Sequence, residues 1–222
     1  MADCAIIFDV DGVLLELTRA EEELFFQPFA SRCDTTKLSR DWNSYAIRND
    51  EDIVAELAQR HNFAQTEKQT IKSEYLNFLR VQLTSDEIAS PTISGATEVL
   101  TEFASCATLG IATANFREAA KLRLSKSNLW HHVSDYAFGA DGGGHKHEIL
   151  GRALASINLP KSRIVYIGDN LNDVEAGLRH GVNFIAFSTK KERLEQLHKA
   201  GAKNISSEHP QTSAIIKTIL NL

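Results

Sequence analysis

The sequence predicts an α/β protein built on a doubly wound parallel sheet, with an all-helical segment inserted near its beginning. Two observations lead to this class. Short, unbroken apolar runs alternate with helical patterns over residues 92–222, and such runs are typical of strands buried on both faces of a parallel sheet. Residues 16–90 break this alternation, because they contain helix signals but no convincing strand.

The first predicted strand, residues 5–8, is a continuous apolar run that ends at Asp9. Similar runs predict further strands at 108–112, 164–167 and 184–187, with a weaker candidate at 136–138. Apolar residues at helical spacing predict helices between them, for example over 96–103 and 149–154. Strands that alternate with helices in this way favour a Rossmann-like sheet with helices on both faces.

The inserted segment carries its own helix boundaries. Pro28 is expected to end or kink a first helix near Phe26. Either Asn49 or Asp50 is expected to cap a second helix. A capping-box pair and an apolar face predict a third helix, through Thr66, Gln69, Ile71, Tyr75, Leu79 and Leu83. We therefore expect residues 1–15 and 91–222 to form the α/β core, and residues 16–90 to form a helical cap.

Composition excludes several classes of protein. The net charge is −5 and the basic residues are scattered, which argues against a nucleic-acid-binding face. No apolar run approaches the roughly 18 residues of a membrane span, and the first residues show neither a basic start nor a cleavage site. The 3 cysteines form no CxxC metal motif. We expect a cytoplasmic monomer with no membrane or nucleic-acid partner.

Polar residues gather where the predicted strands end. Asp9, Asp11 and Gly12 follow the first strand, and Thr113, Ala114 and Asn115 follow the strand at 108–112. Lys146 stands before a helix, and Asp169 and Asp173 follow the strand at 164–167. Because ligands of open parallel sheets bind beyond the carboxyl ends of the strands, these groups are expected to form one site.

The residue types suit phosphoryl transfer. Neighbouring carboxylates repel one another unless a hard cation lies between them, and Mg²⁺ usually takes one or two carboxylates. Asp9 and Asp169 suit that role, with the backbone carbonyl of Asp11 as a third protein ligand. The Thr113 hydroxyl, the backbone N–H groups near Ala114 and Asn115, and Lys146 can supply donors to the phosphoryl oxygens.

The two aspartates after the first strand have different chemical uses. A carboxylate such as that of Asp9 is a competent nucleophile that forms an aspartyl-phosphate. Asp11 can protonate the leaving oxygen and later deprotonate the attacking water. The small residue Gly12 lets the chain turn away from the site. The substrate expected from these groups is a small phosphorylated metabolite.

The opening Phe8-Asp9-Val10-Asp11-Gly12-Val13-Leu14 resembles the DxDG motif of the haloacid dehalogenase superfamily. Thr113, Lys146 and the stretch from Gly168 to Asp173 look like its second, third and fourth motifs, in order. The helical insertion after the first motif is similar to that of phosphoglycolate phosphatases and β-phosphoglucomutases.

This resemblance implies that Asp9 is the nucleophile, Asp11 the acid/base and Asp169 a metal ligand. It implies that Thr113 and Lys146 bind phosphate, and that Asp173 is an outer carboxylate that orients Lys146 or a metal-bound water.

Three positions depart from the family pattern. Ala114 stands where many members have glycine, and Gly168 stands where some members have glutamate. Residues 46–50 occupy the place of the mutases' Gly-x-Ser-Arg loop without matching it. Arg48 lies in this segment. It is either a surface arginine near Asp50 and Asp52 or a substrate-binding residue that holds a carboxylate or a second anionic group by parallel hydrogen bonds.

Three other functions use similar residues. A phosphomutase of the β-phosphoglucomutase type is the nearest alternative to a phosphatase. A dehalogenase needs no Mg²⁺ and lacks the second aspartate, so Asp11, Asp169 and Asp173 argue against it. A phosphorylation-switched receiver module also combines acidic residues, Mg²⁺, Thr and Lys. The long insertion is foreign to receivers, however, and no aspartate directly follows residues 111–112.

Overall fold

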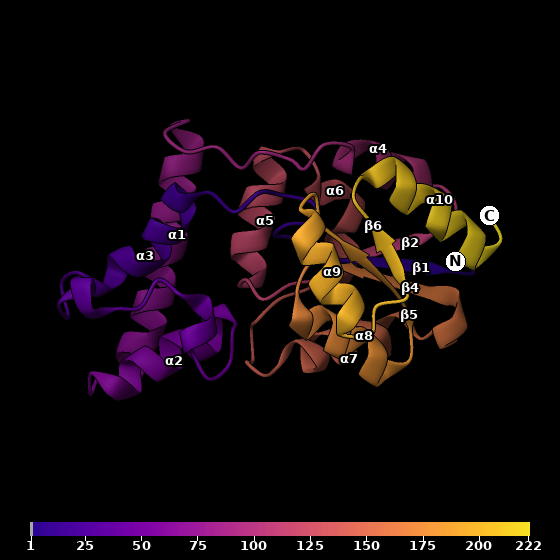
Figure 1. Ribbon diagram of the computed structural model, residues 1–222. Helices are drawn as coiled ribbons and strands as arrows, with labels where there is room; N and C mark the ends of the chain where they lie inside the picture. The colour runs from indigo at the N-terminus through magenta and orange to yellow at the C-terminus, as the bar shows by residue number, and fades with distance from the viewer. Residues whose placement is uncertain (1) are drawn as a thin grey trace.

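The structure is a computed structural model that describes residues 2–222. One sheet of parallel strands has the order β3-β2-β1-β4-β5-β6 (Figure 1). The strands are β1 (Ala5–Phe8), β2 (Thr108–Ala112), β3 (Ala137–Phe138), β4 (Ile164–Gly168), β5 (Asn183–Phe187) and β6 (Asn204–Ser206). The order reverses at β1, as it does in a doubly wound sheet. The predicted α/β class is confirmed, and β6 is a strand that the sequence did not predict.

Helices cover both faces of the sheet because side chains alternate along each strand. Ile6 and Phe8 pack in one apolar cluster with four helices, α4 (Ala96–Phe103), α5 (Arg117–Lys126), α6 (Trp130–Val133) and α10 (His209–Leu220). Ala5 and Ile7 pack in a second cluster with α7 (Lys146–Ile157), α8 (Leu171–His180) and α9 (Lys191–Lys199). Among residues 2–222, no helix combines the length and hydrophobicity that a membrane crossing requires.

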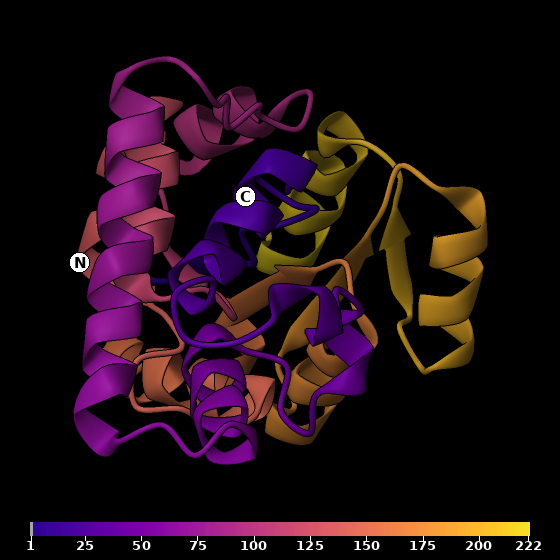
Figure 2. The ribbon, with the colours of Figure 1, turned by 90° about the vertical axis from the view of Figure 1, so that its left-hand side faces the viewer.

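Three further helices and the segments that join them, residues 19–84, form a separate layer, which we name the α1–α3 unit. The helices are α1 (Arg19–Phe26), α2 (Asp50–Arg60) and α3 (Gln65–Thr84). Their apolar faces form a third cluster, which also includes Phe116 and Ala119 beside or on α5. The unit therefore packs on the core through α5, at one end of the sheet (Figures 1 and 2).

Two predicted helix boundaries of this unit are confirmed. Helix α1 ends at Phe26 and gives way to a short 3-10 turn that contains Pro28. Asn49 caps α2, since its side-chain oxygen accepts a hydrogen bond from the Asp52 N–H at 2.9 Å.

The predicted capping box of α3 is wrong. The helix begins before Thr66, at Gln65, and its cap residue Ala64 has no side-chain oxygen. Instead, Glu67 accepts a hydrogen bond from the Ala64 N–H at 2.7 Å. A carboxylate in the first turn thus binds a free N–H group, and this favours the earlier start. The predicted apolar face is confirmed, because Ile71, Tyr75, Leu79 and Leu83 are all buried.

Candidate active site

Strand register brings the polar residues of three strand ends to one edge of the sheet. Phe8, the last residue of β1, lies opposite residues of both β2 and β4. The residues that follow these strands share a cavity of about 670 Å³ with Lys146, the first residue of α7; they are Asp9, Asp11, Thr113, Ala114, Asn115 and Asp169. Side chains of the α1–α3 unit line the same cavity, including Phe25, Trp42 and Arg48.

Lys146 is the centre of the charge arrangement. Its side chain is 3% exposed, and its Nζ lies 2.8 Å from Asp9 Oδ1 and 3.0 Å from Asp173 Oδ1. Burial alone would disfavour the ammonium, but the charges of Asp173 and Asp9 raise the pKa of Lys146 above its ordinary value. Lys146 is therefore a cation at neutral pH, held beside one oxygen of Asp9.

Asp173 is fully buried. Its Oδ1 accepts a hydrogen bond from the Tyr166 hydroxyl at 2.5 Å, and its Oδ2 accepts one from the Asn170 N–H at 3.0 Å. Gly168 makes room for it, because a Cβ at this position would lie 2.4 Å from the Cβ of Asp173. Asp173 is thus placed to orient Lys146, and any side chain at position 168 would displace it.

Asp9 and Asp169 are carboxylates in a poorly solvated site. Burial raises the pKa of Asp9 to about 7, with Asp173 and Asp11 acting in the same direction and Lys146 against it. Burial, followed by the charges of Asp173 and Asp9, raises the pKa of Asp169 to about 8. Oxygens of Asp9, Asp169 and Asp173 lie within 4.8 Å of one another. The oxygens of Asp9 and Asp169 suit a hard divalent cation, whose charge would offset the repulsion.

The close approach of Asp169 to the first loop depends on Gly12. This residue has a φ of 75°, in the left-handed region, and a Cβ there would lie 2.3 Å from Asp169 Oδ2. A larger residue would therefore be strained in its backbone and would displace Asp169. The glycine that the sequence marks as a turn also makes space for the carboxylate.

Thr113 and Asn115 form a small hydrogen-bonded turn at the end of β2. The Asn115 N–H donates to the Thr113 hydroxyl oxygen at 3.2 Å, and Thr113 does not cap the following helix, whose cap residue is Phe116. The Asn115 side chain turns toward Asp11 and donates to its Oδ2 at 3.0 Å. Asn115 therefore contacts the predicted acid/base directly.

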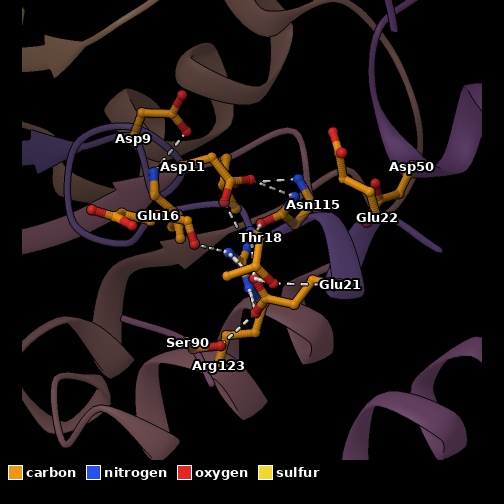
Figure 3. A network of polar contacts seen from close by, with 12 residues as sticks. Asp9, Asp11, Glu16, Thr18, Glu21, Glu22, Asp50, Ser90, Asn115 and Arg123 are labelled. Atoms are coloured by element: carbon orange, nitrogen blue, oxygen red, sulfur yellow. Dashed lines mark hydrogen bonds and ion pairs between the residues drawn. The ribbon is translucent and has the colours of Figure 1, made fainter. Parts of the chain in front are cut away.

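Arg123 is a site residue that the sequence analysis missed. Its side chain is 2% exposed, and its Nη1 lies 2.7 Å from Asp11 Oδ1 (Figure 3). It lies on the buried side of α5 with Ala119, Ala120 and Leu124. A charged residue among the apolar positions of a helix was the available signal, because arginine is almost never fully buried unless paired.

The α1–α3 unit brings further groups to the cavity. Arg48 is half-buried there and donates to Asn43 Oδ1 at 3.3 Å. Asp50, which the sequence analysis considered only as a cap, is buried and accepts a hydrogen bond from the Phe116 N–H at 2.7 Å. Burial raises the pKa of Asp50 to about 7.

The family profile of the haloacid dehalogenase-like hydrolases matches residues 6–187. This chain belongs to that family. The match includes every site residue named above, from Asp9 to Asp173, and it ends with β5. The predicted superfamily is confirmed. A search of curated proteins found no match.

Solved structures of other proteins share the fold over nearly the whole chain. CbbY from Rhodobacter sphaeroides in complex with phosphate has a TM-score of 0.73 and 21% identity, and 100% of each chain is covered. A family hydrolase from Deinococcus radiodurans with bound phosphate and sodium has a TM-score of 0.62 and 20% identity, covering 99% of this chain and 97% of that one. A putative phosphatase from Clostridium difficile has a TM-score of 0.67 and 15% identity, covering 97% of this chain and 99% of that one.

Proposed function

We propose that this hydrolase is a magnesium-dependent phosphatase that cleaves a small phosphorylated metabolite through an aspartyl-phosphate. The main support is the contact between Lys146 and Asp9 in the cavity that Thr113, Asp11 and Asp169 also line. One oxygen of Asp9, Oδ1, accepts hydrogen bonds from the Val10 N–H and Lys146. This leaves Oδ2 for attack on phosphorus.

In the first step, Asp9 Oδ2 attacks and the bond from phosphorus to the leaving oxygen breaks. Asp11 gives that oxygen a proton. In the second step, Asp11 takes a proton from water, which attacks phosphorus and releases inorganic phosphate and Asp9. Lys146 and the Thr113 hydroxyl bind the phosphoryl oxygens. The backbone N–H groups near Ala114 and Asn115 are further candidates.

The residues proposed to hold Mg²⁺ are Asp9, Asp169 and the backbone carbonyl of Asp11. When bound, the cation would neutralise charge on the carboxylates and the transferring phosphoryl group. Asp173 is proposed to act through Lys146, because its own oxygens are occupied by Tyr166, Asn170 and Lys146.

We propose that residues 16–90 act as a cap over this site. Trp42 and Phe25 of this segment line the cavity. The cap already contacts the core, because the Asn49 side chain donates to the Gly144 carbonyl at 2.7 Å and the Asp50 N–H donates to the Ala114 carbonyl at 2.9 Å. A closed cap would exclude bulk water during the first step.

A screen of phosphorylated metabolites for phosphate release tests this function. We expect release from at least one small phosphate ester in the presence of Mg²⁺, without a bisphosphate activator. Phosphate release without an activator distinguishes a phosphatase from a phosphomutase, which returns the phosphoryl group to a sugar. No release from any ester, including p-nitrophenyl phosphate, would contradict the proposal.

Arg48→Ala is expected to raise KM for the best substrate of that screen, because Arg48 lines the cavity and is proposed to hold a second anionic group. Hydrolysis of p-nitrophenyl phosphate should change little, since its leaving group offers no anion. Arg80→Ala, an exposed arginine of α3, is the matched control. Equal losses on both substrates would indicate damaged packing, and no loss on either would place Arg48 outside substrate recognition.

A further inference from the structure

All three nitrogens of the Arg123 guanidinium group contact other residues of the protein (Figure 3). Its Nε donates to Glu21 Oε1 at 2.7 Å, and its Nη2 lies 3.4 Å from Glu21 Oε2 and 3.2 Å from the Glu16 carbonyl oxygen. Its Nη1 donates to Asn115 Oδ1 at 3.1 Å and lies 2.7 Å from Asp11 Oδ1. The group is therefore held on one side by Glu21 and presents Nη1 to Asp11 on the other.

Both oxygens of Asp11 are contacted: Oδ2 accepts a hydrogen bond, whereas Oδ1 takes part in an ion pair without a hydrogen bond. Oδ1 contacts Arg123, and Oδ2 accepts from the Asn115 amide, whose carbonyl oxygen is itself bound by Arg123. Arg123 thus restrains Asp11 directly and also through Asn115. The Asp11 side chain is 25% exposed, so without these contacts a short carboxylate at the mouth of a cavity would be free to change rotamer.

Glu21 balances the charge of Arg123 independently of Asp11. Arg123 and Glu21 are each 2% exposed in their side chains and form an ion pair. Glu21 therefore keeps Arg123 a paired charge in the protein interior, whatever the state of Asp11.

The same contacts reach both chain segments that join the core to the α1–α3 unit. Glu16 lies in the first segment, between β1 and α1, and its carbonyl oxygen accepts from Arg123. Ser90 lies in the second, between α3 and α4, and its hydroxyl donates to Glu21 Oε1 at 2.5 Å. Arg123 and Glu21 therefore connect Asp11 to the two points at which the proposed cap leaves the core.

We propose that Arg123 is a positioning residue for Asp11, and that Glu21 supports it by fixing its guanidinium group and balancing its charge. This inference rests on the proposed function, in which Asp11 transfers protons. Arg123 does not contact the substrate in this proposal. It sets where the Asp11 carboxylate stands when the leaving oxygen needs a proton.

The test compares leaving groups in phenyl phosphate and p-nitrophenyl phosphate, which have nearly the same shape. Phenolate is the more basic leaving group and depends more on the proton from Asp11. In Arg123→Met, we expect kcat/KM for phenyl phosphate to fall about 10²-fold, the size typical of lost acid catalysis, and that for p-nitrophenyl phosphate to fall far less. Arg123→Lys keeps a positive charge, so its kcat/KM for phenyl phosphate should lie between those of Arg123→Met and the native enzyme.

Matched variants separate positioning from folding. Arg123→Met leaves Glu21 as a buried, unpaired carboxylate, so Arg123→Met/Glu21→Leu removes both charges. We expect the double variant to regain melting temperature but not phenyl phosphate hydrolysis. Glu21→Gln should shift the ratio of the two kcat/KM values in the same direction as Arg123→Met, by a smaller factor. Lys126→Met on the same helix, which breaks an ion pair with exposed Asp86, should leave both rates unchanged.

Equal losses on the two substrates, or recovery of both rates in the double variant, would overturn the role of Arg123. Both results can be measured only if the native enzyme hydrolyses these phosphate esters. A native enzyme that releases phosphate from no ester of the metabolite screen, p-nitrophenyl phosphate included, would instead overturn the proposed function, and this inference with it.

Discussion

Asp9→Asn is expected to reduce phosphatase activity by a factor on the order of 10³ or more. Loss of a nucleophile usually costs more than loss of a single stabilising contact, which removes about 10²–10³ in rate. The amide is nearly isosteric with the carboxylate, but it is a poor nucleophile and a weaker metal ligand. Release of inorganic phosphate from the best substrate, measured with excess Mg²⁺, checks this prediction.

The fold of the Asp9→Asn variant should remain intact. The amide oxygen can still accept from the Val10 N–H and from Lys146, and Lys146 keeps Asp173 as a partner at 3.0 Å. Thermal unfolding in chelator should therefore resemble that of the native protein. Asp135→Asn, an exposed aspartate outside the cavity, is the control and should retain full activity. More than a few per cent of native activity in Asp9→Asn would refute the nucleophile assignment.

The sheet was predictable because its central strands are buried on both faces and read as unbroken apolar runs. The exception is β6, Asn204–Ser206, at the edge of the sheet. It is only 3 residues long and has one apolar residue, Ile205, which is itself 37% exposed. A strand this short, paired only with β5, leaves no periodic pattern in the sequence.

The sequence predicted those residues of the candidate site that come directly after a strand. Asp9, Thr113 and Asp169 come directly after strands, so the topology alone gathers them. Arg123 and Tyr166 carry no such signal, since one lies within a helix and the other within β4. Their roles depend on which residues pack against them. Arg123 meets Glu21, 102 positions earlier in the chain, and that contact follows from three-dimensional packing of the α1–α3 unit.

Activity is expected to disappear in excess chelator and to return when Mg²⁺ is added. Without a divalent cation, Asp9 and Asp169 face one another in a poorly solvated cavity, and both would repel the phosphate of a substrate. Phosphate release before and after titration with Mg²⁺ measures the effect. Full activity in excess chelator would remove the metal from the mechanism.

The pH dependence of Mg²⁺ binding gives a second readout that is independent of turnover. The pKa values of Asp9 and Asp169 are raised to about 7 and about 8, so both carboxyls hold protons as the pH falls below this range. A cation must displace those protons, and binding therefore releases them. We expect the apparent affinity for Mg²⁺, measured by calorimetry, to rise as the pH increases through about 7 to 8. Asp169→Asn should weaken binding and flatten this dependence. An affinity that stays constant over the same range would show that the cation does not bind between these two carboxylates.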